Sequence, residues 1–213
     1  IYMLPGYTSK FGVTPTVSSE EMIQCAARGA AAAGGVGPDD IGYASVGNNI
    51  DAILNGNSLL SSFLAKELPN THYIDHAENA CASSSSAVLQ ALMALQSGLA
   101  ECALVVGYEK QHGSIESPSK EQKQEQNARV GQALGTCAYP ADRNPGEDMG
   151  FTFPFLFAKV MRAAMEQGVT SEQLAFISVK NFNAGGRNLT AHFYGKSTTM
   201  EKALESPIFF KGY

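Results

Sequence analysis

A cysteine stands where the sequence changes from strand-like to helix-like. Residues 71–75 have β character, Cys81 follows them in the stretch Glu78–Ala87, and a run of small residues, Ala82–Ala87, comes directly after it. Apolar residues then recur at helical spacing, at Ala87, Val88, Ala91, Leu92, Leu95 and Leu99. The free N–H groups and the positive dipole end of a helix start favour a thiolate, which is the nucleophilic form of cysteine. Cys81 is therefore the candidate nucleophile.

The other cysteines carry weaker signals. A free cysteine is more often a packed small hydrophobe than a nucleophile. Cys25 and Cys102 lie in apolar, periodic stretches, so we expect both to be packed, and Cys137 lies in an irregular region that we do not assign to the site. The four cysteines are widely spaced without a Cys-x-x-Cys pair, which predicts neither a disulfide framework nor a zinc site and favours a reducing cytoplasm.

The histidines have no metal-ligand spacing. His76 lies five positions before Cys81 and could be a partner base, but we interpret it as a surface or strand-end histidine. The others are His72, His112 and His192, and no glutamate stands between two histidines at helical distance. We therefore predict no metal site.

The composition limits the class of protein. Of 213 residues, 44% are hydrophobic and 16% are charged, which is typical of a globular chain with a buried core. The net charge of −5 argues against nucleic-acid binding. No run of 18 apolar residues occurs, so we predict no membrane span. Both ends, at Ile1 and at 208–213, suggest a piece of a larger fold, and residues 1–4 suggest the tail of a first strand.

Strand and helix patterns alternate up to residue 110. A capping box at Ser18 opens a helix that ends at Gly34-Gly35, and Asn57 could cap a second helix that reaches Leu64. Three strands are expected at 41–47, 73–75 and 102–107, the last as a central strand covered on both faces. This order predicts an α/β fold with a mostly parallel sheet and helices on both faces. Ligands of such sheets bind beyond the carboxyl ends of the strands, where Cys81 lies.

The character of the chain changes after residue 110. Residues 111–126 are polar, contain a proline and lack an apolar period, and residues 141–148 are rich in turn formers. A helix is expected at 154–168, and another begins near Thr170. The expected buried face of the first comprises Phe157, Val160, Met161, Ala164 and Met165. Long polar excursions from a rigid sheet commonly carry substrate contacts.

Two sequence motifs resemble the nucleophile segment of the thiolase superfamily. They are Asn79-Ala80-Cys81-Ala82-Ser83-x-Ser85-x-Ala87 and the stretch from Gly98 to Lys110. The chain is most similar to the branch of the sterol-carrier-protein-type thiolases and acetyl-CoA acetyltransferase-like proteins. Residues 172–191 and 198–207 resemble the loop domain of that branch. The resemblance implies a thiolase-like core at 1–110 and, at 111–213, a loop domain that covers the substrate and coenzyme A.

The resemblance also implies a chemistry. In thiolases the matching cysteine takes an acyl group from coenzyme A as a thioester, so Cys81 would serve an acyl-CoA acyltransferase. Coenzyme A would be a substrate, and no permanently bound cofactor is implied. A complete thiolase has a second half with a Gly-His-Pro segment and a Cys-x-Gly segment, and this sequence contains neither. We therefore expect the chain to provide about half of an active enzyme.

Two other functions stay open. A ketosynthase-like condensing enzyme would use the same cysteine, although its partner histidines are also missing. A non-catalytic thiolase-like subunit would bind acyl-CoA or act as a scaffold for a partner. The resemblance implies a dimer formed through the strand before the nucleophile, or assembly with a C-terminal thiolase half. It also implies a small zinc-ribbon/OB-fold partner protein.

Overall fold

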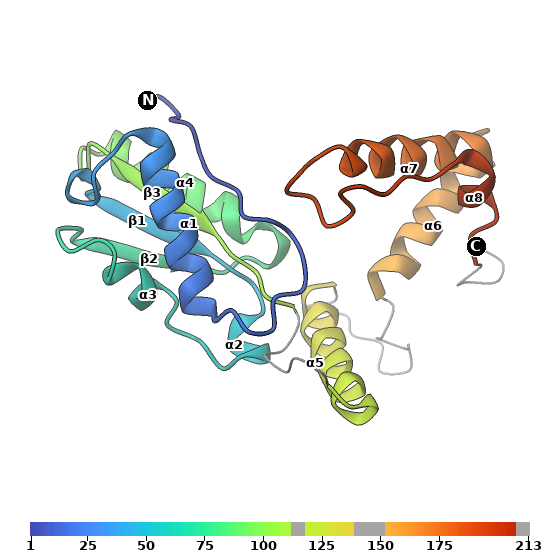
Figure 1. Cartoon of the computed structure of the whole chain (residues 1–213), viewed down its shortest axis with the longest axis horizontal. Coiled ribbons are helices and arrows are strands. Elements are labelled where there is room, and N and C mark those ends of the chain that lie inside the picture. The colour runs from blue at the N-terminus through green and yellow to red at the C-terminus, as the bar shows by residue number, and fades with distance from the viewer. Residues whose placement is uncertain (112–117, 139–151, 208–213) are drawn as a thin grey trace. The chain divides into compact units, whose positions relative to one another are not determined.

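The computed structural model describes residues 1–111, 118–138 and 152–207, and the chain divides into two compact units (Figure 1). The first unit consists of residues 1–9 and 13–133, and the second consists of residues 10–12 and 134–213. The first unit contains the sheet and the candidate nucleophile, whereas the second is built from helices in its described part.

The sheet has three parallel strands, β1 (Tyr43–Gly47), β2 (Tyr73–Ala77) and β3 (Ala103–Gly107). Their order is β2-β1-β3, and Gly47 at the end of β1 lies opposite Ala77 and Gly107. The predicted α/β fold with a parallel sheet is confirmed. Within the described residues the central strand is β1, which is buried along its whole length, so the prediction that 102–107 is a central strand is wrong here.

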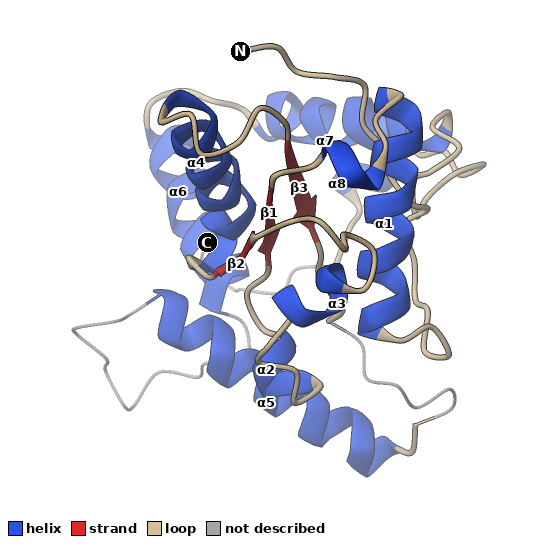
Figure 2. Ribbon diagram, turned by 90° about the vertical axis from the view of Figure 1, so that its left-hand side faces the viewer, coloured by secondary structure: helices blue, strands red, loops and turns tan. Residues whose placement is uncertain are grey.

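Helices cover both faces of the sheet (Figure 2). Side chains alternate along a strand, so neighbouring residues of β1 face opposite layers. Ala44 and Val46 pack with α1 (Ser19–Gly34) and α3 (Ser61–Ala65), whereas Tyr43 packs with α4 (Ser83–Gln96). The first cluster is the larger and includes Ile23, Leu60, Leu64, Leu104 and Val106.

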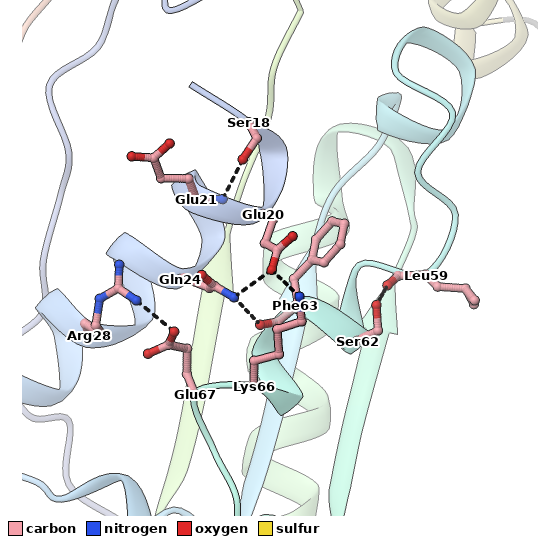
Figure 3. A network of polar contacts seen from close by, with 10 residues as sticks. All are labelled: Ser18, Glu20, Glu21, Gln24, Arg28, Leu59, Ser62, Phe63, Lys66 and Glu67. Atoms are coloured by element: carbon pink, nitrogen blue, oxygen red, sulfur yellow. Dashed lines mark hydrogen bonds and ion pairs between the residues drawn. The ribbon is translucent and has the colours of Figure 1, made fainter. Parts of the chain in front are cut away.

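Helix α1 begins after Ser18 and ends at Gly34-Gly35, as predicted, and the Ser18 half of the predicted capping box forms. The Ser18 hydroxyl accepts a hydrogen bond from the N–H of Glu21, and Gly35 ends the helix in a left-handed conformation at a φ of 66°. Polar contacts then join α1 to α3 (Figure 3). Glu20 accepts bonds from Gln24 and Lys66, and Arg28 pairs with Glu67. Such exposed pairs contribute little to stability individually, so the apolar core holds the two helices together.

The segment after β1 differs from the prediction. A short 3-10 helix, η1 (Pro38–Asp40), precedes β1, and α2 (Asp51–Leu54) follows it. Asn57 does not cap a helix, because its amide donates to Ser19 and Asp51. Helix α3 begins at Ser61 after Leu60, without a side-chain cap, so the Asn57 side chain serves the buried carboxylate of Asp51 as a donor instead.

Helix α4 presents its small residues to the sheet. Its buried residues are Ser83, Ala87, Ala91 and Ala94, whereas Val88, Leu89, Leu92 and Met93 are exposed. Val88 and Leu92 belong to the apolar residues that recur at helical spacing in the sequence, but they do not face the sheet. Small residues allow the helix backbone to approach the sheet closely, which leaves the larger apolar side chains on the opposite face.

Helix α5 (Lys120–Ala138) occupies part of the stretch that lacks an apolar period. Ser119 caps it, because its hydroxyl accepts from the N–H of Gln122 while its own N–H donates to the Gln122 side chain. Glutamate, lysine and glutamine are good helix formers. Pro118 lies before the helix, where it interrupts no helical hydrogen bond. The lack of an apolar period in residues 111–126 therefore does not mean the absence of a helix, which begins at Lys120.

The second unit contains α6 (Thr152–Glu166), α7 (Ser171–Gly186) and α8 (Met200–Leu204). Asn183 joins the last two, since its side chain donates to the Thr198 carbonyl at 3.1 Å and accepts from the Thr198 N–H at 2.9 Å. On α6, Phe157, Val160, Met161 and Met165 are exposed, so the expected buried face is not covered by described residues. Residues 1–4 form no strand. Among the described helices, none is both long and apolar enough to cross a membrane.

Candidate active site

Cys81 lies in the turn between β2 and α4. The turn leaves the strand after Ala77, passes through a short 3-10 helix, η2 (Ala80–Ala82), and enters α4 at Ser83. Cys81 is exposed, so a reagent can reach its thiol. The structure thus puts this residue at the carboxyl edge of the parallel sheet, where folds of this class bind ligands.

Hydrogen bonds from side chains hold this turn. The buried Ser83 hydroxyl accepts from the N–H of Asn79 at 2.9 Å and donates to the carbonyl of Ala80 at 2.7 Å. The Glu78 carboxylate accepts from the N–H of Ala80 at 2.9 Å. Ala80 has a φ of +49°, a left-handed conformation that is unfavourable for a residue with a Cβ. The surrounding bonds therefore impose a strained residue immediately before the cysteine.

Two groups of Cys81 have no partner within the described chain. Neither its thiol nor its backbone N–H makes a hydrogen bond to a described residue. The neighbouring N–H groups of Asn79, Ala80 and Ala82 all donate to acceptors of the turn. The Cys81 N–H is thus available to an incoming oxygen, next to a sulfur that can attack the carbon bearing that oxygen.

A polar cluster occupies the same edge of the sheet, beyond β1 and β3. Its centre is Asp51, which has no exposed surface. The carboxylate accepts bonds from Ser19 at 3.2 Å and Tyr108 at 2.9 Å. The side-chain amides of Asn55 and Asn57 also donate to it, at 2.5 and 2.9 Å. Four neutral donors therefore satisfy a carboxylate that would otherwise be costly to bury.

Glu109 joins the ends of β1 and β3. Its carboxylate accepts bonds from the Asn48 side chain at 3.0 Å and from the N–H groups of Asn49 at 3.0 Å and Ile50 at 3.4 Å. Desolvation of the carboxylate raises the pKa of Glu109, against the opposing effect of these bonds. Sequence reasoning missed Asp51 and Glu109. Both lie a few residues after the end of a strand, and this position of acidic residues is the signal that could have indicated them.

His76 does not partner Cys81 in the structure. It lies opposite Val46 in the sheet register, and Val46 faces the layer of α1 and α3, whereas α4 covers the other face. Its Nε2 atom is buried and has no hydrogen-bond partner among the described residues. His72 and His192 are exposed, and His112 lies outside the described residues. No group of three metal-ligating side chains occurs in the described part of the chain.

The cysteines differ in exposure. Cys25 is exposed, so the prediction that it is packed is wrong, whereas Cys102 is half-buried. Desolvation, with a smaller effect of Asp40, raises the pKa of the Cys102 thiol and makes it a poor nucleophile. Cys25, Cys81 and Cys102 are all free thiols, and the side chain of Cys137 lies outside the described residues.

The fold is a parallel α/β sheet with an exposed cysteine before a helix at its carboxyl edge, and comparison with known families gives the assignment. The family model described as thiolase, N-terminal domain, matches residues 6–197. The chain belongs to the thiolase family.

Two curated relatives carry the same printed name, acetyl-CoA acetyltransferase. The protein from Methanothermobacter thermautotrophicus is 30% identical over 211 residues, covering 94% of this chain and 48% of the relative. The protein from Methanocaldococcus jannaschii is 29% identical over 206 residues, covering 94% of this chain and 47% of the relative. The chain spans about half the length of the curated relatives it matches.

A solved structure supports the fold. The chain titled Ltp2-ChsH2(DUF35) aldolase matches with a TM-score of 0.55 and 15% sequence identity. The match covers 92% of this chain and 46% of that chain. At this level of identity the likeness concerns the fold alone.

Proposed function

We propose that this chain is the nucleophile-bearing part of a thiolase-type acyl-CoA acyltransferase. The observation that carries the proposal is the exposed Cys81 at the carboxyl edge of the sheet, whose thiol and N–H make no hydrogen bond to a described residue. Membership of the thiolase family and the printed activity of the two curated relatives support the reaction class. Coenzyme A and its acyl thioesters are the proposed substrates, without a permanently bound cofactor.

The proposed first step forms an acyl-cysteine. The Cys81 thiolate attacks the carbonyl carbon of an acyl-CoA, a sulfur–carbon bond forms, and the carbonyl electron pair moves onto oxygen. The Cys81 N–H donates to that oxygen. When the carbonyl re-forms, the bond to the coenzyme A sulfur breaks and coenzyme A leaves as a thiolate. The acyl group then passes to another coenzyme A, or to a carbon nucleophile in the condensing direction.

The described residues supply only part of this machinery. No described side chain lies within hydrogen-bond distance of the Cys81 thiol to act as a base. An oxyanion donor is typically worth about 3 kcal/mol of transition-state stabilisation, so a missing second donor makes acylation slow. We propose that a C-terminal thiolase half provides the base and the acid/base cysteine, within the same polypeptide or from a second chain.

The exposed face of α4 favours such a partner half. Val88, Leu89, Leu92 and Met93 form an apolar stripe on the helix that begins just after Cys81. A partner that covers this stripe would also be held beside the cysteine. We further propose a dimer through β2, whose second edge pairs with no described strand, and an optional small zinc-ribbon/OB-fold partner. The free thiols fit a reducing, cytoplasmic setting.

Mass spectrometry of the whole chain after incubation with acetyl-CoA tests the proposal. We expect one acetyl group per chain, mapped to the peptide that contains Cys81 and lost in Cys81→Ala. Cys25→Ala is the matched control, because Cys25 is also exposed, and this variant should keep the adduct. Equal labelling of the two cysteines would contradict the proposal. Binding of acetyl-CoA without any adduct would identify a non-catalytic subunit instead.

A further inference from the structure

The start of α4 rests against two glycines that end neighbouring strands. Gly47 ends β1 and Gly107 ends β3, and the two are register partners across the sheet. Both lie directly beside Ser84, in the first turn of the helix that follows Cys81. Neither glycine has a positive φ, so backbone conformation does not require glycine at either position.

The space at Gly47 is closed by backbone atoms. A Cβ placed there would lie 2.6 Å from the Ser84 Cα, 2.7 Å from the Ser84 nitrogen and 2.9 Å from the Ser83 carbonyl carbon. No rotation of a side chain can relieve contacts of this kind. Any larger residue at position 47 must therefore push the first turn of α4 away from the sheet.

The space at Gly107 is closed by a side chain. A Cβ placed there would lie 2.7 Å from the Ser84 Oγ and 3.6 Å from the Ser84 Cβ. The second distance is an ordinary van der Waals contact. The close approach thus depends on one hydroxyl oxygen, which can rotate away or be removed by substitution.

A shift of the helix start would deform the turn that carries Cys81. At one end, Ala77 is fixed by the pairing of β2 with β1. At the other, the Ser83 hydroxyl holds Asn79 and Ala80 to the helix start. The five residues between these ends include the strained Ala80, so they cannot easily change conformation when the helix start is displaced.

We propose that Gly47 and Gly107 are positioning residues for Cys81. They set how deeply the first turn of α4 sits against the sheet and so orient the thiol and its N–H. The role rests on the proposed function of Cys81 as the acyl acceptor. The competing explanation is that the two glycines only allow α4 to pack against the sheet. It predicts that their substitution lowers the free energy of unfolding without any change specific to Cys81.

The test compares the reactivity of two cysteines in the same full chain. The rate of iodoacetamide alkylation of Cys81 is divided by that of Cys25, which lies on α1. We expect Gly47→Ala to lower this ratio about tenfold, because a displaced helix start changes the exposure of the Cys81 thiol and its distance from the N–H groups of the helix start, which govern cysteine reactivity. Gly107→Ala should lower it about twofold to threefold, as expected for a clash that a rotamer change relieves. Gly185→Ala is the control, since a Cβ on Gly185 would meet nothing within 4 Å.

Removal of the Ser84 hydroxyl makes the test specific. Ser84→Ala should restore the ratio in Gly107→Ala but not in Gly47→Ala, because only the first clash involves that oxygen. Failure of this rescue, or an unchanged ratio in both folded glycine variants, would overturn the proposal. If Gly47→Ala does not fold, the comparison of Gly107→Ala with and without Ser84→Ala tests the proposal. Alkylation needs no acyl-CoA, so the absence of an acetyl adduct in the wild type would reject the proposed function without affecting this comparison.

Discussion

The hydroxyl of Tyr108 lies 2.9 Å from the Oδ1 atom of Asp51, a carboxylate that has no exposed surface. This bond links the residue that follows β3 to the first residue of α2. The Oγ atom of Ser19, at the start of α1, lies 2.7 Å from the same hydroxyl. Three segments that are distant in sequence therefore meet at one buried carboxylate, on the edge of the sheet where Cys81 lies.

Loss of the Tyr108 hydroxyl is expected to destabilise the first unit. Tyr108→Phe leaves buried polar atoms of Asp51 and Ser19 with one partner fewer, so the free energy of unfolding should fall by about 1–3 kcal/mol in urea titrations. Tyr73→Phe is the control, because Tyr73 is half-exposed on β2 and should change stability by less than about 0.5 kcal/mol. Equal effects of the two substitutions would argue against the importance of the buried carboxylate.

The Ser83 hydroxyl is expected to matter for the reactivity of Cys81. Ser83→Ala removes both hydrogen bonds that hold Asn79 and Ala80, so the left-handed Ala80 should relax. The initial rate at which the Cys81 acetyl adduct forms should fall about tenfold, which corresponds to about 1.4 kcal/mol of activation free energy. Ser85→Ala, an exposed position of the same helix turn, should leave it unchanged. The prediction fails if the two serine variants react alike.

Stability at high pH is expected to depend on Tyr43. Desolvation, together with the hydrogen bond to Asp75, raises the pKa of Tyr43 to about 12. The folded state therefore binds this proton more tightly than the unfolded chain, in which a tyrosine has a pKa of about 10. The free energy of unfolding from this group is fully present below pH 10 and is lost as the pH rises to about 12.

Unfolding titrations of Tyr43→Phe check this sign. Between pH 10 and 12 the variant should lose less stability than the wild type, and the late part of the tyrosinate absorbance change should shrink. The pKa of Tyr108 is also raised, mainly by desolvation. Because Tyr108 is present in both proteins, its effect on stability cancels in the comparison. A steeper loss in the variant would contradict the prediction.

Substitutions on the two faces of α4 are expected to differ in their cost to stability. Ala87 is fully buried against the sheet, so Ala87→Leu should overpack it and cost about 1–3 kcal/mol in the free energy of unfolding. Leu89 is 58% exposed, so Leu89→Ala should cost less than about 0.5 kcal/mol in this chain alone. If a partner half covers α4, Leu89→Ala should also weaken that complex, as measured by sedimentation. A large cost of Leu89→Ala in the isolated chain would contradict the exposed face.

Adjacent glycines in the second unit give a matched pair. A Cβ on Gly186 would lie 2.0 Å from the Lys196 carbonyl oxygen, whereas one on Gly185 would meet nothing within 4 Å. Gly186→Ala should therefore destabilise the end of α7, as measured by hydrogen exchange of its amides. Gly185→Ala should stabilise the helix by about 0.5–1 kcal/mol because alanine loses less backbone entropy. Similar exchange in both variants would refute the close contact.

Much of the first unit could be predicted because its signals are local. A capping serine and a left-handed glycine mark the ends of α1 by chemistry that involves a few neighbouring residues. The three strands follow from short apolar runs, and the place of Cys81 between strand and helix follows from the change of period. Helix α5 has no apolar period, so periodicity does not predict it, although its capping box, Ser119 and Gln122, is equally local.

The faces of the helices could not be predicted in this way. Periodicity identifies an apolar stripe but not the layer that the stripe contacts. In α4 the sheet approaches so closely at Gly47 that alanines and a serine must face it, so the larger apolar side chains point away. On α6 the stripe is exposed within the described chain. The role of Asn57 and the exposure of Cys25 likewise depend on contacts between distant segments.

The sequence by itself determined the class of fold, the family resemblance and the identity of the candidate nucleophile, because these depend on short-range patterns of residue type. The tertiary structure alone decided what surrounds that nucleophile. The bonds of Ser19 and Tyr108 to the buried Asp51, and the close approach of Gly47 and Gly107 to the start of α4, result from segments brought together by folding. Backbone direction and burial set these contacts, and neither is encoded in the spacing of residues along the chain.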